Sequence, residues 1–126
     1  MKILYRSLQV RPGHATIFGV RDQILFFSLP GPPSAVHILF NELVRPVIFA
    51  LQGKRGAPEK VLAILEQDIV IRKRGVLNLK NGTTAVRSGL FSVRPAGLTE
   101  ACIATILIPG NRRLIRTGKK VTIHLH

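Results

Sequence analysis

The residues best suited to carry chemistry form a proline-rich loop between an apolar run and a helical pattern. Residues 29–34 read Leu-Pro-Gly-Pro-Pro-Ser, after the apolar run 23–29 and before a helical periodicity that Ser34 begins. Open α/β sheets bind ligands where the carboxyl end of a strand leads into a helix. The N–H groups and dipole of that helix favour an anion, commonly a phosphate. Because prolines lack the N–H donor, the alternative is a rigid stop before a helix, with no ligand.

The second chemical feature is an excess of positive charge. The 126 residues include 19 Lys and Arg against 6 Asp and Glu, a net charge of +13, and most of the excess lies in residues 54–126. Basic residues at 72–74 and 112–120 could follow a polyphosphate or a nucleic-acid backbone; the alternative is a solvated charged face. Six Phe and one Tyr are the aromatic residues, and most Phe lie in core-like runs. This disfavours base stacking on single strands.

Metal and nucleophile chemistry have weaker signals. The four histidines lack close metal-ligand spacing, and we expect His124 and His126, at the chain end, to be solvated. Cys102 lies in an apolar run and is predicted to be a small buried hydrophobe. As the one cysteine it excludes a disulfide framework and fits a reducing compartment. The most apolar stretch, 36–51, is shorter than the roughly 20 residues a bilayer needs. We therefore expect a cytoplasmic protein without a membrane or targeting segment.

The first half of the chain has the pattern of an α/β unit. Strands are expected at 15–20 and 23–29, the second buried on both faces because its apolar run is nearly continuous. A helix is expected from Ser34 to Leu51, ending before Gly53. Pro46 within this helix predicts a kink.

The second half follows a Gly- and Pro-containing basic linker at 53–58. Its apolar residues come in shorter runs than those of the first half. A short helix is expected at 58–67, and Asn81-Gly82 predicts a hairpin turn. Short apolar runs separated by turn signals predict a small β-barrel or sandwich, with strands at 69–71, 76–79, 85–93, 102–108 and 121–125. The predicted fold class is mixed α/β, with a strand–loop–helix unit (1–53) followed by a small β-barrel domain (54–126).

The order of these features resembles one known family. Residues 10–19 (Val-Arg-Pro-Gly-His-Ala-Thr-Ile-Phe-Gly) precede residues 26–35, which contain the proline loop, and a helix with Arg45-Pro46 inside it that ends at Gln52-Gly53. This resembles the C-terminal part of the molybdenum insertases, or molybdopterin molybdotransferases (the MoeA/gephyrin E-domain family). That family has Lys-Pro-Gly-Lys-Pro, then Leu-Pro-Gly-Asn-Pro-x-Ser, then a helix with an internal Arg-Pro. The likeness is looser after residue 78.

The resemblance implies a molybdopterin-binding type of α/β domain, here only partial, and the family's terminal β-barrel domain. It also implies that the chain binds anionic molybdopterin or molybdate. Pro30 and Pro33 match the family's two functional loop prolines, and Arg11 stands where a functional lysine precedes Pro-Gly. Arg74 and Ser88 match an arginine and a serine of the terminal domain. Ser34, which begins the helix beside the prolines, completes the candidate cofactor-binding residues.

The chain also departs from the family pattern. Pro32 replaces the loop asparagine, His14 the second lysine, and Ser7 an upstream lysine. The family's Gly-Gly-x-Ser segment, catalytic acidic residues and N-terminal domains have no counterpart. We therefore expect a truncated insertase-like protein of molybdenum cofactor biosynthesis that contributes to binding rather than to complete catalysis, so whether it is an enzyme stays open. Mg²⁺ would require carboxylates from a partner chain.

Two other functions remain open: a basic β-barrel that binds nucleic acid, and a scaffold that kept the fold and lost the ligand. In either case the small α/β half leaves strand edges and an apolar helix face uncovered. We expect homo-oligomerisation, or a partner chain that completes this half.

Overall fold

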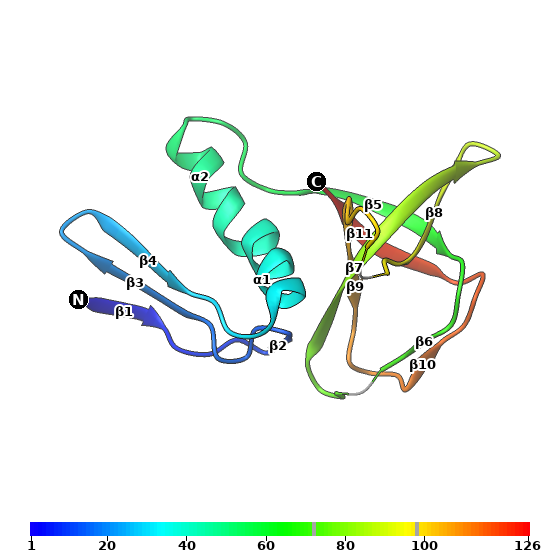
Figure 1. Ribbon diagram of the computed structural model, residues 1–126, viewed down its shortest axis with the longest axis horizontal. Helices are drawn as coiled ribbons and strands as arrows, with labels where there is room; N and C mark the ends of the chain where they lie inside the picture. Colours follow the sequence, from blue (N-terminus) through cyan, green and yellow to red (C-terminus); the bar gives the residue numbers. More distant parts are fainter. Residues whose placement is uncertain (72, 98) are drawn as a thin grey trace. The chain divides into compact units, whose positions relative to one another are not determined.

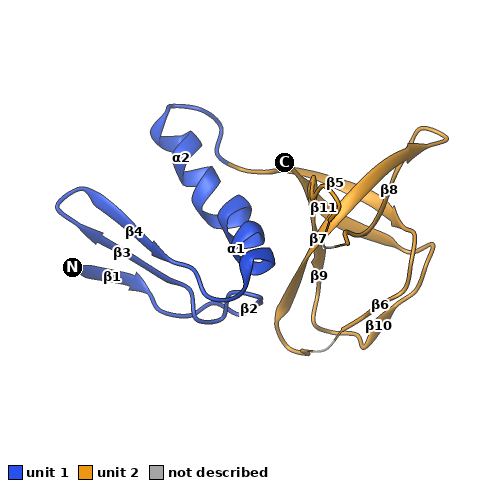
Figure 2. Cartoon of the chain, in the orientation of Figure 1, with its two compact units in different colours: residues 1–56 blue, residues 57–126 orange. Residues whose placement is uncertain are grey.

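The chain folds into two compact units, residues Met1–Gly56 and Ala57–His126 (Figures 1 and 2). The computed structural model describes residues 1–71, 73–97 and 99–126. Unit 1 contains a small sheet and a helix, and unit 2 contains the β-barrel. The predicted mixed α/β class therefore fits the structure.

The sheet of unit 1 is antiparallel, with the order β1 (Lys2–Tyr5), β3 (Ile17–Arg21), β4 (Ile24–Ser28). The short strand β2 (Val10–Arg11) lies between β1 and β3 in the chain.

One face of this sheet carries an aromatic row. The ring centroids of Phe18 and Phe27 are 4.5 Å apart, and those of Tyr5 and Phe18 are 5.5 Å apart. On the other face, Ile24 and Phe26 are 57% and 42% exposed. The strand expected at 23–29 forms β4, and the expectation that it is buried on both faces was wrong. Alternate side chains of a β-strand point to opposite faces, and in β4 only the side chains on the aromatic face are half-buried.

The helical segment of unit 1 runs without a break from Pro33 to Leu51. It comprises α1 (Pro33–Leu39), a π-helical segment η1 (Phe40–Val44) and α2 (Arg45–Leu51). The segment η1 interrupts the α-helical hydrogen bonds just before Pro46, and the Arg45 N–H donates to the Phe40 carbonyl. Gly53 (φ +73°) ends the helix as expected: its N–H donates to Ala50 and the Lys54 N–H donates to Phe49.

The same segment, Pro33–Leu51, is 19 residues long and is the one helix among the described residues that is long and apolar enough to cross a membrane. This finding rests on length and composition only. A core helix of a soluble protein meets the same criterion, so a single such helix is weak evidence for a membrane span.

Unit 2 is a closed five-stranded barrel, which confirms the predicted barrel. Its strand order is β7-β8-β5-β11-β9, and a further pairing of β7 with β9 closes the ring. The barrel strands are β5 (Glu59–Leu65), β7 (Leu77–Arg87), β8 (Leu90–Pro95), β9 (Ala104–Ile108) and β11 (Lys120–Leu125). The pairs are antiparallel except β5 with β8. Two short strands, β6 (Ile69–Val70) and β10 (Leu114–Ile115), form a separate ribbon.

The barrel encloses a core of small and branched apolar side chains. Leu65, Val93, Ile106, Ile108 and Ile123 are fully buried. Because a small barrel leaves just enough interior space for its inward side chains, these residues fill it.

Three expected elements of unit 2 were wrong. The single strand expected at 85–93 is divided by a turn at Ser88-Gly89 between β7 and β8. Residues 58–67 were expected to be helical, but residues 59–65 form β5, in which Ala63 and Leu65 are buried and Leu62 is 62% exposed. This alternation is that of a strand with one face on the barrel core and the other toward solvent. Pairing of β5 with β8 and β11 overrode the local helical pattern. The Asn81-Gly82 hairpin does not form either, because β7 continues straight through these residues.

Gly82 is needed for packing rather than for a turn. A Cβ at this position would lie 2.9 Å from Ile106 Cγ1 and 3.0 Å from Val93 Cγ2. Residues 78–82 of β7 pair with β9, and residues 82–87 pair with β8. Gly82 therefore sits where β7 passes from one neighbour to the other, close against the core.

We predict that Gly82→Ala destabilises the protein by about 1–3 kcal/mol, because the added methyl overpacks the barrel core. Urea unfolding followed by circular dichroism measures this change. Gly89→Asn is the control: the φ of Gly89 is +75°, which Asn tolerates, and a Cβ there meets nothing within 4 Å. Equal stability of Gly82→Ala and wild type would contradict the packing role.

Candidate functional site

The proline loop leads from β4 into the first turn of α1. Gly31 has φ +99°, which lets the chain turn, and Pro32 is the N-cap residue. Pro30 is half-buried, whereas Pro33 and Ser34 are exposed. Pro33 has no N–H, and the N–H groups of the next turn already donate to the Pro32 carbonyl, from Ala35 at 2.9 Å and Val36 at 3.1 Å. This helix start therefore offers an anion fewer backbone donors than usual.

The loop that follows Arg11 is fixed against the other end of α1. A Cβ on Gly13 (φ +119°) would lie 2.6 Å from Leu39 Cδ2, so the backbone approaches the helix as only glycine allows. The Thr16 N–H donates to the Gly13 carbonyl at 3.1 Å. The Arg11 side chain is exposed. Because α1 rises about 1.5 Å per residue, the contact at Leu39 lies roughly 9 Å along the helix from its start.

Arg74 lies in an exposed turn of unit 2 that is tied to a second loop. The Gly75 N–H donates to the Gly110 carbonyl at 3.0 Å. The Asn78 amide donates to the carbonyls of Lys73 and Val76, at 2.9 and 3.1 Å. Arg74 thus stands on a well-fixed backbone, and among residues 1–71, 73–97 and 99–126 its guanidinium takes part in none of the ion pairs. Arg72, part of the same predicted basic run, lies outside the described residues.

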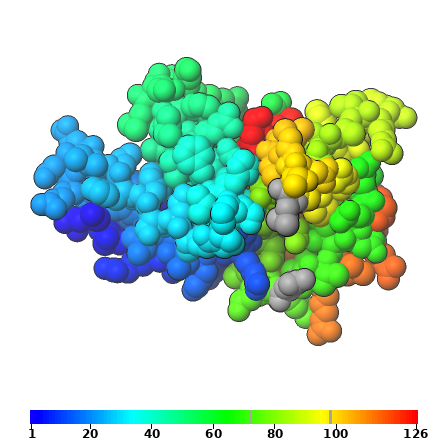
Figure 3. Space-filling view, viewed as in Figure 1, coloured from blue at the N-terminus to red at the C-terminus, as the bar shows by residue number. Residues whose placement is uncertain are grey.

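Ser88 lies at the tip of the β7–β8 hairpin, which stands out from the surface of unit 2 (yellow-green in Figure 3). Ser88 (φ +52°) and Gly89 (φ +75°) form a two-residue hairpin turn. The local sequence predicted a turn of this kind at Asn81-Gly82 instead. Arg74 precedes β7 and Ser88 follows it. Since β7 has 11 residues at about 3.3 Å each, these two candidates lie roughly 30 Å apart along the strand. One copy of the barrel does not bring them to the same small ligand.

A concave site that sequence reasoning missed lies beside this hairpin. Its volume is about 580 Å³, and apolar side chains such as Leu90 and Phe91 line it together with Glu66, Arg87 and Arg94. The Arg87 guanidinium lies 3.3 Å from the Glu66 carboxylate. Arg94 donates to both carboxylate oxygens of Glu100, one of them at 2.7 Å. The Arg94–Glu100 pair had no signal in the sequence, because the likeness to the molybdenum insertases is loose after residue 78.

The described carboxylates do not fit a magnesium site. No group of three or more His, Cys, Asp or Glu side chains is arranged to hold a metal within residues 1–71, 73–97 and 99–126. Glu66 and Glu100 pair with arginines, and Asp68 accepts hydrogen bonds from the N–H and hydroxyl of Thr117, at 2.7 and 2.9 Å. Those bonds lower the pKa of Asp68.

Two single-residue expectations can also be placed. Cys102 is half-buried rather than buried, and its thiol lies 3.7 Å from the Glu100 carbonyl. The strand expected at 102–108 forms β9, which begins at Ala104. Cys102 therefore precedes the strand and is not a core position. His126 is not simply solvated: its Nε2 lies 2.7 Å from the Thr105 hydroxyl.

The Glu100 loop provides a test of the pairing at the concave site. Hydrogen bonds from Arg94 and from the Gly97 N–H lower the pKa of Glu100 from 4.5 to about 2. The carboxylate therefore contributes stability above pH 4.5, and the contribution is lost as the pH falls toward 2, because the unfolded chain takes up the proton first.

We predict that Glu100→Gln lowers the urea midpoint at pH 7 and that wild type and variant converge near pH 2. Glu59→Gln removes an exposed carboxylate of β5 and serves as the control. A constant difference between wild type and Glu100→Gln from pH 7 to pH 2 would contradict the assigned pairing.

The fold and the loops together define a class: a small β-barrel domain preceded by a proline-loop and helix unit. Sequence comparison finds curated proteins that are similar to almost the whole of this chain. A curated molybdopterin molybdenumtransferase of Staphylococcus epidermidis is 29% identical over 133 residues, which covers 98% of this chain and 32% of that protein. The molybdopterin molybdenumtransferase of Bacillus subtilis is 24% identical over 132 residues, covering 98% and 30%. No family model matches the chain.

Solved structures show the same fold. A molybdopterin biosynthesis MoeA protein from Pyrococcus horikoshii superimposes with a TM-score of 0.75 at 21% identity, covering 98% of this chain and 32% of that one. A molybdenum cofactor biosynthesis protein from Pyrococcus furiosus superimposes with a TM-score of 0.70 at 23% identity, covering 99% and 45%. These comparisons confirm the resemblance to molybdenum insertases and are consistent with their C-terminal part. The chain spans about a third of the length of the curated relatives it matches.

Proposed function

We propose that this chain acts in molybdenum cofactor biosynthesis by contributing to the binding of molybdopterin or molybdate. The candidate contact residues are Arg11, Pro30, Pro33 and Ser34 of unit 1 and Arg74 of unit 2. Ser88, at the far end of β7 from Arg74, would reach the same small ligand only from a second copy of the chain. The relatives named above support the biosynthetic context. The role of each residue is our inference.

The observation that carries the proposal is the placement of two motif loops on one helix. The proline loop forms the start of α1, and the loop after Arg11 packs on Leu39 at its end. Arg11 supplies an exposed guanidinium, which binds phosphate and oxoanions by charge-assisted hydrogen bonds. Because the helix start has few free N–H groups, the positive side chain rather than the backbone supplies most of the attraction.

The proposed role is binding rather than complete catalysis. Cleavage of a phosphate-linked pterin requires a metal held by carboxylates, and the described carboxylates of unit 2 are largely engaged with arginines and Thr117. Those carboxylates would come from a partner chain. We place this function in the cytoplasm, because a chain with one cysteine fits a reducing compartment.

We predict that Arg11→Ala and, separately, Arg74→Ala each weaken binding by about tenfold or more, since each removes a charged hydrogen-bond donor. Isothermal titration with molybdopterin, and separately with molybdate, measures the affinity. Arg21→Ala removes an exposed arginine from the β3–β4 turn that has no proposed role, and its affinity stays at the wild-type value. Saturable binding that neither Arg11→Ala nor Arg74→Ala weakens would reject these residues, and absence of binding in wild type would reject the function.

We also propose that the chain self-associates through unit 1. Among the described strands, β4 is an edge of its sheet, and Ile24 and Phe26 expose apolar surface on one face. Burying such surface is favourable by about 25 cal/mol per Å².

We therefore expect light scattering to report a species larger than one chain, and Ile24→Lys/Phe26→Lys to shift it to the monomer. Leu62→Lys, at a similarly exposed position of β5 in unit 2, leaves the size unchanged. A monodisperse wild-type monomer would rule out this association.

A further inference from the structure

The positive charge of unit 2 is concentrated on two loops that the fold ties together. The first loop joins β6 to β7 and carries Lys73 and Arg74. The second joins β9 to β10 and carries Arg112 and Arg113. We call these four residues the basic loops. All four are exposed.

Backbone contacts hold the two loops side by side. The Ile71 N–H donates to the Arg113 carbonyl at 2.8 Å, and the Gly75 N–H donates to the Gly110 carbonyl at 3.0 Å. A Cβ on Gly110 would overlap the Val76 carbonyl and lie 2.8 Å from the Gly75 nitrogen. Below this junction the β6–β10 ribbon pairs Val70 with Leu114. The cations therefore stand on a rigid support and need little ordering when they bind.

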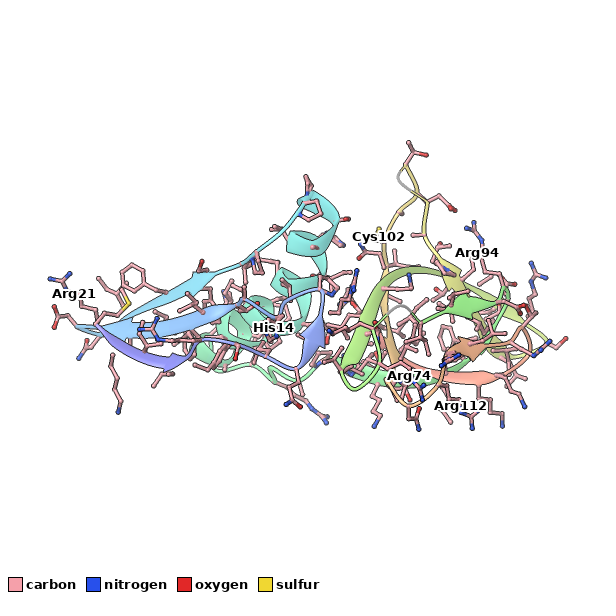
Figure 4. All side chains as sticks on the ribbon, turned by 90° about the horizontal axis from the view of Figure 1, so that it is seen from below. His14, Arg21, Arg74, Arg94, Cys102 and Arg112 are labelled. Carbon is pink, nitrogen blue, oxygen red and sulfur yellow. The ribbon has the colours of Figure 1, made fainter. Side chains whose placement is uncertain are left out.

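Figure 4 shows Arg74 and Arg112 on the same edge of the barrel, and in Figure 3 the second loop (orange) projects from the surface.

The charge of the basic loops is not neutralised within the described part of the chain. The ion pairs there join Arg21 to Asp22, Arg87 to Glu66 and Arg94 to Glu100. None includes a residue of the basic loops. The nearby carboxylate of Asp68 is occupied by Thr117 and faces Arg116. Four adjacent cations without internal partners repel one another, and a multivalent anion relieves that repulsion.

The composition of the loops indicates which anion. Residues 71–76 and 109–113 contain no aromatic residue, and Phe91 in β8 is the one aromatic residue of unit 2. Base stacking, the usual means of holding single strands, is therefore not available at the loops. Three of the four cations are arginines, whose planar guanidinium fits phosphate. A duplex presents closely spaced phosphates in a rigid array, which meets several fixed cations at once.

We propose that the basic loops bind the phosphate backbone of double-stranded nucleic acid without reading its sequence. This surface shares Arg74 with the proposed molybdopterin function, but Arg112 and Arg113 have no part in that function, so variants of these two residues test the surface separately. It accounts for charge that cofactor binding does not use. Binding of this kind weakens with salt, with a slope of log affinity against log salt of about −0.9 per neutralised phosphate.

The test uses Arg112→Ala/Arg113→Ala and fluorescence anisotropy of a fluorescein-labelled duplex of about 20 base pairs, titrated between roughly 50 and 200 mM salt. If each of the four cations meets one phosphate, the wild-type slope is about −3.6 and the variant slope about −1.8, which corresponds to a loss of roughly 60-fold in affinity at 0.1 M salt. Arg112→Lys/Arg113→Lys keeps the wild-type slope, because a point charge is sufficient.

The matched control is Arg6→Ala/Arg55→Ala, which removes the same charge from exposed positions of unit 1 and keeps the wild-type slope to within about half a unit. Equal slopes for wild type and Arg112→Ala/Arg113→Ala would overturn the proposal, as would a control variant that loses as much affinity. Competition by polyglutamate as effective as that by unlabelled duplex, at equal charge, would assign the loops to an acidic protein partner instead. Molybdopterin titration of the same variants, unchanged if the proposal holds, separates this outcome from a failure of the cofactor site.

Discussion

Unit 2 depends on the pairing of one long strand with two neighbours. The first part of β7 pairs with β9 and the second with β8, and this double pairing closes the barrel and removes its free edges. The crossing is possible because Gly82 has no side chain, so that Ile106 and Val93 approach its backbone. The same pairing brings the start of β7 to the end of β9, where Asn78 faces Ile108. The loops that carry Arg74 and Arg112 therefore become neighbours, while Ser88 is carried to the other end of the strand.

Unit 1 also depends on a glycine that allows close packing of the backbone. Gly13 lets a loop of the chain approach Leu39 closely, and the prolines set the start of the helix. One helix thereby holds both motif loops that resemble the molybdenum insertases. The same unit leaves Ile24 and Phe26 exposed, a cost that a partner surface would offset.

The two proposed activities share Arg74 but otherwise draw on different charges of the molecule. Cofactor binding uses Arg11 of unit 1 and Arg74 of unit 2. The basic loops use four cations that have no carboxylate partner in the described residues. Arg87 and Arg94, in contrast, are paired and line a concave site of about 580 Å³. A net charge of +13 is therefore distributed over paired, singly placed and clustered cations, and only the clustered ones favour a polyanion.

Local sequence by itself determined the helix that ends at Gly53, the proline loop before it and the presence of a small barrel, because capping, proline geometry and the spacing of apolar runs act over a few residues. The motif residues of 10–53 also carry the resemblance to the molybdenum insertases. Only the tertiary structure decided that 59–65 is a strand, that Gly82 packs rather than turns, and that Ser88-Gly89 makes the hairpin. Each of these depends on which distant strand pairs with which, and two turn-forming dipeptides are locally equivalent until that pairing selects one. Strand pairing also makes residues 74 and 112 neighbours, and the proposed binding of nucleic acid depends on this.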